Sequence, residues 1–471
     1  MLVRRFYDDR LAQASYLIGC QRIGEAIVVD PARDITPYLE AAKAEGMRIT
    51  RVTETHIHAD FVSGARELAA ATGATPLLSA EGGSDWQYAW AEEARATLLR
   101  DGDTITLGGV RLEVWHTPGH TPEHLSFVVI DTARSEDPVA MLTGDFIFVG
   151  DVGRPDLLEK AAHVEGTMEA GARQLFRSIQ RTASLPDHLQ IWPGHGAGSA
   201  CGKALGAMPT STLGYERRTN WAFGIDDETA FVTAVLEGQP TPPAYFGMMK
   251  RINKLGATVL GTRGPTSRLD LKAFDGATDS GAVLDVRPAA TWAGGHLRGT
   301  LNIPLIKAFT TWAGWLLNYE QPITLVADTQ AQADDARRAL ASIGLDRVRG
   351  WLDATQTMTA FPERVTSARR GDITQAEAIA ATGRQVIDLR ETNEWDAGHL
   401  PVAAHHPLGT LRTTLQDLPR ETPLAVHCQA GTRSAIGISV LAAMGFTDVM
   451  DLNAGYAGWR AAERERSGGP A

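Results

Sequence analysis

Two histidines and an aspartate crowd into the segment THIHADFVSG, residues 55–64. His56, His58 and Asp60 alternate along it, and imidazole nitrogens and carboxylate oxygens are common donors to metal ions in proteins. A phenyl ring follows at Phe61, and this ring has no lone pair to give to a cation. The segment therefore predicts a metal centre, and Phe61 bears on how many ions that centre holds.

Three more candidate ligands follow glycines in later segments: His120 in HTPGHT, Asp145 in LTGDF and His195 in WPGHG. Glycine lets the backbone turn sharply and aim the next side chain inward. A single histidine or aspartate in a loop is more often a cap or a hydrogen-bonded turn residue than a ligand. Taken together and in this order, the residues favour a metal site.

A second group of reactive residue types occurs in LAVHCQAGTRSAIGISVLAAMG, which predicts an apolar strand, a short loop and a helix ending at Gly445. Cys428 stands just before the helix, where free N–H groups and the positive end of the helix dipole stabilise a thiolate. Arg433 adds a cation nearby. A buried, inert cysteine is the common alternative, but this arrangement favours a catalytic thiol.

The elements that must position these residues can also be read from the pattern. β-rich runs such as AIVVD and RVTET alternate with helical stretches such as ITPYLEAAKAEG, which should end at Gly46. RVTET would place His56 at the carboxyl end of a strand, where α/β proteins commonly build sites. The proline-rich segment GQPTPPAY predicts a domain boundary, so the first domain should span 1–245.

An internal repeat follows this boundary. VLDVRPAATWAGGHLRGTLNIP, from Val283, matches VIDLRETNEWDAGHLPVAAHHP, from Val386. The repeat predicts two copies of one α/β domain, over residues 265–360 and 370–466. Asp328 in the first copy falls opposite Cys428, and a carboxylate cannot carry sulfur. We therefore expect the first copy to be inert and to serve as a spacer, docking surface or lid.

Composition excludes several classes of function. The formal net charge of -11 and the lack of a basic stripe argue against nucleic acid as a partner. No apolar run is long enough to span a bilayer and no signal-type region is visible, so we expect a cytoplasmic protein without a membrane partner. Three scattered cysteines, Cys20, Cys201 and Cys428, do not suggest a disulfide framework.

The histidine and aspartate segments resemble the metallo-β-lactamase superfamily, whose signature is H-x-H-x-D-H followed by a distant His, an Asp and a last His. The resemblance implies a four-layer αββα sandwich with a metal between two sheets. Hydrolytic members hold two zinc ions, but Phe61 replaces a histidine of the second zinc site. A single-metal centre is therefore expected, and within the superfamily the segments are most similar to the persulfide dioxygenases.

That resemblance implies one Fe(II) per chain, held by His56, His120 and Asp145. A triad of this kind leaves positions open for water, dioxygen and a substrate sulfur, and it suits Fe(II). The remaining candidates would then orient these ligands or bind water; they are His58, Asp60 and His195. The family pattern also implies three substrate-binding residues, with packing as the alternative for the last: Arg154, Tyr215 and Cys201.

The segment around Cys428 resembles a rhodanese domain, with Cys428 and Arg433 as catalytic residues. A class of protein phosphatases shares this architecture but has five residues between Cys and Arg, whereas CQAGTR has four. The smaller loop suits the outer sulfur of a persulfide, so a sulfurtransferase is expected.

The order of domains resembles the CstB-type bacterial sulfide-detoxification enzymes. This resemblance implies oxidation of a small-molecule thiol persulfide by O₂ to sulfite, and transfer of a second sulfur to sulfite to give thiosulfate. We expect a homo-oligomer, and the sequence leaves the carrier thiol open. Two alternatives are a two-metal thioester hydrolase like glyoxalase II, fused to a sulfurtransferase, and a sulfur sensor or delivery scaffold.

Overall fold

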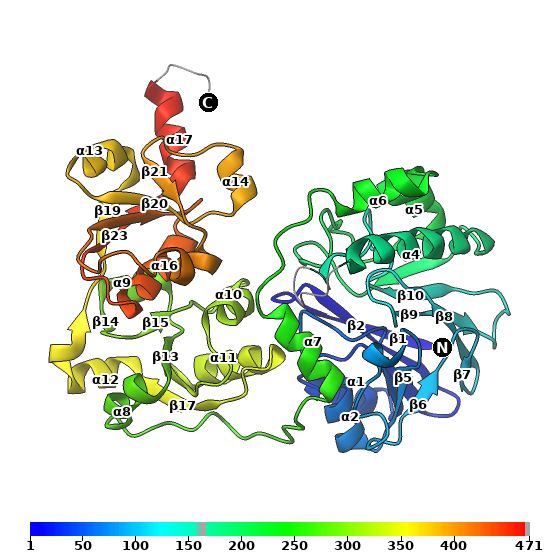
Figure 1. Ribbon diagram of the computed structural model, residues 1–471. Helices are drawn as coiled ribbons and strands as arrows, with labels where there is room; N and C mark the ends of the chain where they lie inside the picture. Colours follow the sequence, from blue (N-terminus) through cyan, green and yellow to red (C-terminus); the bar gives the residue numbers. More distant parts are fainter. Residues whose placement is uncertain (158, 160–165, 467–471) are drawn as a thin grey trace. The chain divides into compact units, whose positions relative to one another are not determined.

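The computed structural model describes residues 1–157, 159 and 166–466 (Figure 1). Their contacts form two compact units. The first unit comprises Met1–Arg263 with Ala341–Gly344, and the second comprises Gly264–Leu340 with Leu345–Ala471. Within the described residues, none of the helices has the length and apolar character needed to cross a bilayer.

The first unit contains two six-stranded sheets. In spatial order, the strands of the first sheet are β1 (Leu2–Asp8), β2 (Gln13–Cys20), β3 (Glu25–Val29), β4 (Arg48–Thr53), β5 (Thr75–Ser79) and β6 (Thr97–Leu99). Those of the second sheet are β12 (Ser211–Thr212), β11 (Gln190–Pro193), β10 (Ala140–Gly144), β9 (Leu125–Asp131), β8 (Val110–His116) and β7 (Thr104–Leu107). Strands β3 to β6 are parallel, whereas β7 to β10 are antiparallel.

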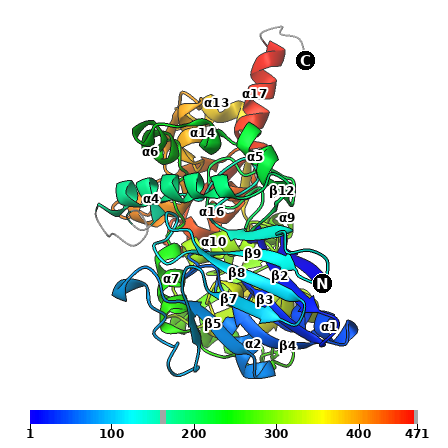
Figure 2. The same cartoon turned by 90° about the vertical axis from the view of Figure 1, so that its right-hand side faces the viewer.

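Helices cover the outer face of each sheet (Figure 2). Helices α1 (Thr36–Ala44) and α2 (Ala65–Thr72) pack on the first sheet. Helices α4 (Thr167–Arg181) and α6 (Glu228–Leu236) pack on the second. The central core lies between the sheets and includes inward residues of β2 and β8, which alternate along the strands as a half-buried sheet requires. The predicted αββα sandwich is confirmed.

The remaining helices of the first unit include α5 (Leu213–Thr219) and α7 (Phe246–Leu255). Helix α7 lies beyond the boundary predicted at residue 245, and it belongs to the first unit. The helix expected from ITPYLEAAKAEG is α1, and the chain leaves it through Gly46 at φ +63°. That left-handed backbone conformation favours glycine at the end of a helix.

The second unit contains two parallel sheets, one in each copy of the repeat. The first sheet is ordered β15 (Leu301–Asn302), β13 (Ala282–Asp285), β16 (Ile323–Ala327) and β17 (Val348–Asp353). The second is ordered β19 (Arg369–Asp372), β23 (Val449–Asn453), β22 (Leu424–His427), β20 (Gln385–Asp388) and β21 (Ala403–His405). A separate ribbon pairs β14 (His296–Leu297) with β18 (Val365–Thr366).

Short helices flank these sheets (Figure 1). Those of the first copy are α8 (Ala273–Ser280), α9 (Ala289–Gly294), α10 (Phe309–Leu316), α11 (Gln330–Ser342) and α12 (Ala354–Ala360). Those of the second copy are α13 (Ala376–Ala381), α14 (Thr392–Asp396), α15 (Leu411–Thr414), α16 (Thr432–Ala443) and α17 (Gly455–Arg466).

Hydrogen bonds fix how the two copies correspond. In the first copy, Val286 N donates to Val326 O at 3.0 Å; in the second, Leu389 N donates to His427 O at 2.9 Å. Each donor is the middle residue of a D-x-R motif that the two copies share, DVR at 285–287 and DLR at 388–390. Val326 therefore corresponds to His427.

The residue that corresponds to Cys428 is therefore Ala327, and the predicted pairing with Asp328 is wrong by one position. Asp328 lies one residue further into the loop and is exposed. Its backbone N–H is taken by the Gln332 side chain at 2.9 Å. The conclusion that the first copy lacks the sulfur-carrying thiol does not change, because alanine cannot carry sulfur either.

The two copies pack against each other within the second unit. Helix α16 contacts β15 of the first copy, where Asn302 N donates to Ser439 Oγ at 3.0 Å. A Cβ atom built on Gly409 would lie 2.8 Å from the Trp315 side chain, so the copies approach closely there as well. Helix α16 is consequently buried along most of its length.

Candidate functional site

The candidate ligands of the first unit all follow the carboxyl ends of strands. His56 comes after β4, His120 after β8, Asp145 after β10 and His195 after β11. Gly144 precedes Asp145 and has φ +49°, and a Cβ atom there would lie 2.6 Å from an atom of a neighbouring loop. The backbone can therefore make this turn only with glycine, as the sequence predicts.

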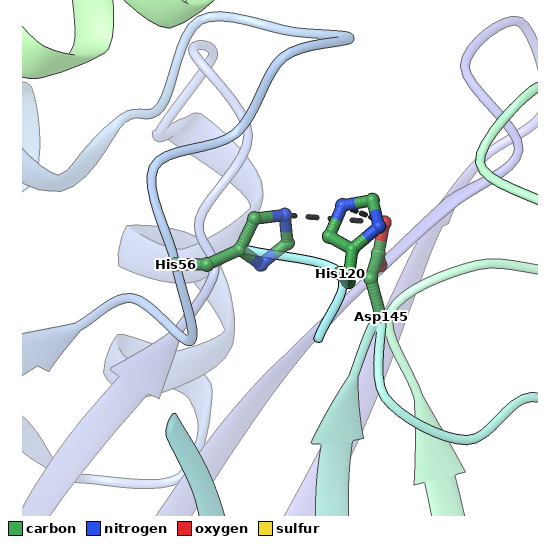
Figure 3. Close-up of side chains that lie close together, drawn as sticks. All are labelled: His56, His120 and Asp145. Carbon is green, nitrogen blue, oxygen red and sulfur yellow. Dashed lines mark ion pairs between the residues drawn. The ribbon is translucent and has the colours of Figure 1, made fainter. Parts of the chain in front are cut away.

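Three of these residues form one buried cluster, His56, His120 and Asp145 (Figure 3). One ligand atom from each lies within 4.8 Å of the others. The Nε2 atoms of His120 and His56 lie 3.4 and 3.9 Å from the same carboxylate oxygen, Asp145 Oδ2. Two imidazoles and one carboxylate thus converge on a single point.

The donor atoms of this cluster suit a metal ion. Among the residues that the structure describes, His56 Nε2 and both carboxylate oxygens of Asp145 are buried without a hydrogen-bond partner. Buried polar atoms normally have one, so these atoms indicate an ion. Burial and neighbouring imidazoles lower the pKa of His56 well below its usual value. The ring is therefore neutral, which is the form that binds a metal.

Neighbouring groups orient the ligands. His120 Nδ1 donates to Arg154 O at 3.0 Å, which leaves Nε2 free to face the cluster. His56 Nδ1 lies 3.0 Å from Thr55 Oγ1, whose hydroxyl donates to Asp30 Oδ2 at 2.9 Å. Asp30 directly follows β3, and sequence reasoning missed it. The only local signal was a carboxylate at the end of an apolar run.

His58 lies apart from the three clustered residues. Its Nε2 atom is 2.9 Å from Asp30 Oδ1, and its ring centroid is 4.4 Å from that of Phe61. Burial opposes protonation, but the carboxylates of Asp30 and Glu54 outweigh it and raise the pKa of His58 to about 9. Its Nδ1 atom has no hydrogen-bond partner in the described part of the chain. The predicted role of His58 in orienting ligands stays a prediction.

Asp60, His195 and Cys201 form a second buried group of possible ligands beside the first. His195 Nε2 lies 3.2 Å from Asp60 Oδ2 and 3.5 Å from Asp145 Oδ1. Burial and the carboxylates of Asp60 and Asp145 raise the pKa of the Cys201 thiol well above its usual value. The sequence predicted a substrate-binding role for Cys201, with packing as the alternative; its Sγ atom lies in this buried group, and the role stays a prediction.

Arg154 and Tyr215, the other predicted substrate-binding residues, lie in different surroundings. Arg154 is fully buried, and its Nε and Nη2 atoms donate to the two carboxylate oxygens of Asp156 at 2.6 and 2.8 Å. A substrate carboxylate would have to compete with Asp156 for this guanidinium, which weighs against the predicted role. Tyr215 lies on α5 and is 50% exposed. Both roles stay predictions.

Asn253 of α7 holds the segment that carries His58 and Phe61. Its Nδ2 atom donates to His58 O at 2.8 Å and to Phe61 O at 2.7 Å. Its Oδ1 atom accepts from Ser63 N at 2.9 Å. No motif marks Asn253, so only the fold reveals that it fixes this segment.

The loop of the second unit places Cys428 between β22 and α16. Gly431 N donates to Cys428 Sγ at 3.1 Å, at the start of the helix. The Cys428 side chain is buried. Tyr456 N donates to Cys428 O at 2.8 Å and holds the loop from the other side.

Arg433 forms a bidentate ion pair with Glu394 of α14, at 2.5 and 2.8 Å. Glu394 also accepts from Glu391 N at 3.1 Å, which closes a capping box on α14. Sequence reasoning predicted the cation but not its partner, because the two residues lie far apart in the chain.

Comparisons with known proteins agree with this architecture. The metallo-beta-lactamase superfamily model matches residues 8–195. The rhodanese-like domain model matches residues 373–462, which form most of the second copy of the repeat.

The relatives of this chain differ from one another in activity. A hydroxyacylglutathione hydrolase of Methylococcus capsulatus is 33% identical over 38% of this chain, and the chain spans 60% of that protein. The mitochondrial persulfide dioxygenase ETHE1 of Bos taurus is 26% identical over 41% of this chain and 68% of that protein.

A solved structure extends the likeness further. The crystal structure of a metallo-beta-lactamase from Staphylococcus aureus is 42% identical in sequence, with a TM-score of 0.67. The match covers 75% of this chain and 99% of that one. The chain therefore belongs to the metallo-beta-lactamase superfamily, and it carries a rhodanese-like domain after the metallo-beta-lactamase fold.

Proposed function

We propose that the first unit is a persulfide dioxygenase and that the second unit carries a sulfurtransferase. The observation that carries the proposal is the buried cluster of two imidazoles and one carboxylate, in which His56 Nε2 and both Asp145 carboxylate oxygens have no hydrogen-bond partner among the described residues. This donor set suits Fe(II) and leaves positions for substrate and O₂. The likeness to a persulfide dioxygenase supports the same reading.

The reaction converts R–S–SH, O₂ and H₂O into R–SH, sulfite and two protons. In this proposal Fe(II) supplies redox chemistry that Zn²⁺ lacks. His56, His120 and Asp145 would hold the ion. Phe61 stands where the resemblance places a further ligand, and its ring packs on His58.

The second reaction uses Cys428. The thiolate attacks the outer sulfur of a persulfide, takes that sulfur as Cys–S–S⁻ and releases the carrier thiol. Sulfite then attacks the outer sulfur, the S–S bond breaks, and thiosulfate leaves with the Cys428 thiolate restored. The order of the modules resembles the CstB-type enzymes, which supports a shared role in sulfide detoxification.

A thioester hydrolase like glyoxalase II is the alternative for the first unit. The second group of possible ligands favours it, because Asp60 and His195 could hold a second ion. The similarity to a hydroxyacylglutathione hydrolase agrees. Against it, Phe61 removes one nitrogen donor from the second ion, and a Cys201 thiol with a raised pKa is a poor replacement.

Metal content and oxygen uptake together test the proposal. Anaerobically purified protein should hold about one iron per chain, and it should consume O₂ when a glutathione or coenzyme A persulfide is added. His120→Ala removes one of the three ligands, so iron content and oxygen uptake should both fall at least about tenfold. His188→Ala is the matched control, because His188 is exposed.

Two zinc ions per chain with rapid hydrolysis of S-lactoylglutathione and no oxygen uptake would establish the alternative. Unchanged iron content in the His120→Ala variant would remove His120 from the ligands.

A further inference from the structure

We propose that Glu394 limits the affinity of the Cys428 site for anionic sulfur acceptors, because it neutralises Arg433. The inference rests on the proposed sulfurtransferase. It assigns a specificity role to a carboxylate that touches Arg433 and not the reacting sulfur.

The ion pair between these residues is well formed and partly shielded. Both terminal nitrogens of Arg433 donate to the carboxylate of Glu394, at 2.5 and 2.8 Å. The Arg433 side chain is 17% exposed and that of Glu394 is 30% exposed. An arginine held this way offers little free charge to an incoming anion unless the pair opens.

A second arginine near the loop is paired as well. Arg390, the other guanidinium near the loop, is paired with Asp388 at 2.7 Å and lies over the Tyr456 ring at 4.0 Å. Glu391 adds a second carboxylate close enough to interact with Arg433. Counting these five side chains, two arginines face three carboxyl groups, so these side chains add no net positive charge to that of the α16 N-terminus.

Both reactants at the Cys428 loop are anions. Sulfite carries its charge to a cysteine persulfide that is itself negative: Cys–S–S⁻ and SO₃²⁻ give Cys–S⁻ and S₂O₃²⁻. Like charges at short range repel, and a free guanidinium would offset this repulsion. When Glu394 holds Arg433, the guanidinium is not available for that purpose.

The first copy of the repeat indicates that the fold itself does not need the pair. Counting from the shared D-x-R motif, Thr291 occupies the position of Glu394. Counting from Ala327, Gln332 occupies the position of Arg433. The copy keeps the same strand order around β13 and β16 without either charge. The ion pair therefore occurs only in the copy that has the thiol.

Protection of Cys428 from alkylation measures anion affinity without turnover. Iodoacetamide is uncharged, so its access does not depend on the local potential, and peptide mass spectrometry separates Cys428 from the other two cysteines. The measured quantity is the sulfite concentration that halves the alkylation rate of the reduced full-length protein. Glu394→Gln keeps the shape and hydrogen-bonding capacity of the side chain and removes its charge.

We expect Glu394→Gln to lower this concentration about three- to fivefold, the range for release of a partly exposed ion pair. The double variant Glu394→Gln/Arg433→Ala should lose that gain, because the affinity acts through Arg433. Glu421→Gln, an exposed carboxylate of the same copy, controls for net charge and should leave the concentration unchanged.

An unchanged value in Glu394→Gln, or a gain that persists without Arg433, overturns the inference. Turnover separates it from the proposed function. A wild-type protein that forms no thiosulfate from persulfide and sulfite contradicts the sulfurtransferase, whereas the protection values still decide the role of Glu394.

Discussion

Glu123 is a fully buried carboxylic acid beside the loop that carries His56. Its Oε1 atom accepts from Ile57 N at 2.8 Å, while Oε2 has no hydrogen-bond partner among the described residues. Burial raises the pKa of Glu123 from 4.5 to about 7, although hydrogen bonds to the carboxylate oppose this. The folded protein therefore keeps its proton at a pH where the unfolded chain has lost it.

This difference predicts how stability depends on pH. Between about pH 4.5 and 7 the folded state binds more protons at Glu123, so its contribution is complete below pH 4.5 and is lost as pH rises through 7. The shift corresponds to about 3 kcal/mol. Glu123→Gln should remove the loss, so its melting temperature relative to wild type should rise by about 5 °C between pH 5 and pH 8.

Differential scanning fluorimetry at the two pH values measures this difference. Glu40→Gln, on the exposed face of α1, should show no such change. A constant offset between wild type and Glu123→Gln would mean that Glu123 does not titrate in this range.

At this scale the sequence predicts residue types better than their partners. Residue types and spacing gave six candidate ligands, and the family resemblance implied which three of them bind the ion; those three do cluster. Asp30 and Glu394 could not be inferred in the same way, because each meets its partner only after strands or helices from other parts of the chain have packed.

At the scale of elements, α7 holds residues 58–63, which follow the candidate ligand His56, in place. The three hydrogen bonds of Asn253 satisfy two carbonyl groups and one N–H group of residues 58–63. Trp90 Nε1 also donates to Asn253 O at 3.1 Å and anchors the helix. The segment therefore depends on a helix that lies nearly two hundred residues further along the chain.

Asn253→Asp should weaken metal binding. A carboxylate cannot donate to the two carbonyl oxygens, so the segment should shift and the iron content should fall several-fold. The electron paramagnetic resonance spectrum of the nitric oxide adduct should change as well. Both would be measured on protein purified without oxygen.

Asn220→Asp is the matched control. Asn220 is as buried as Asn253 and also makes three side-chain hydrogen bonds, but it contacts Asp151, Glu216 and Ala222. It should lower stability without changing the spectrum. The same spectral change in both variants would mean that α7 contributes only to general stability.

The strands and helices of the first unit agree with those expected from the sequence. The spacing of apolar residues and the positions of glycines depend only on neighbouring residues, so the sequence alone shows them. The end of the unit was harder to place. GQPTPPAY has the composition of a linker, yet the chain after it returns to the first unit as α7. Composition marks where a chain turns, whereas contacts decide which unit a helix belongs to.

At the scale of the whole molecule, the two units should perform successive steps with a diffusible intermediate. Cys428→Ser removes the sulfur carrier and leaves the metal ligands intact. Oxygen uptake should stay within about twofold of wild type, while the product changes from thiosulfate to sulfite. Chromatographic quantification of both anions measures the ratio.

Cys20→Ser is the control, since Cys20 lies in the first unit and is not assigned to either reaction. A product ratio unchanged in Cys428→Ser would show that the rhodanese-like copy lies outside the pathway.

The repeat was visible in the sequence, but its register was not. Val326 and His427 differ in chemistry, and aligning the strand ITLVAD with the Cys428 loop placed Asp328 opposite the thiol, whereas the backbone hydrogen bonds select Ala327. Similar segments in the sequence reveal that a domain is duplicated, whereas the hydrogen bonds between strands show which residues of the two copies correspond.

Through the contact of α16 with β15, the second copy of the repeat, which carries Cys428, depends structurally on the first copy, which has no such thiol. The helix that presents the thiol rests along its far half on a strand that does no chemistry, and Ser439 is anchored there by the Asn302 backbone. The first copy can therefore lack every reactive group and still be needed to support α16. Substitutions on β15, the edge strand of that copy, should therefore disturb the placement of Cys428 even though the residues of its own loop are unaltered.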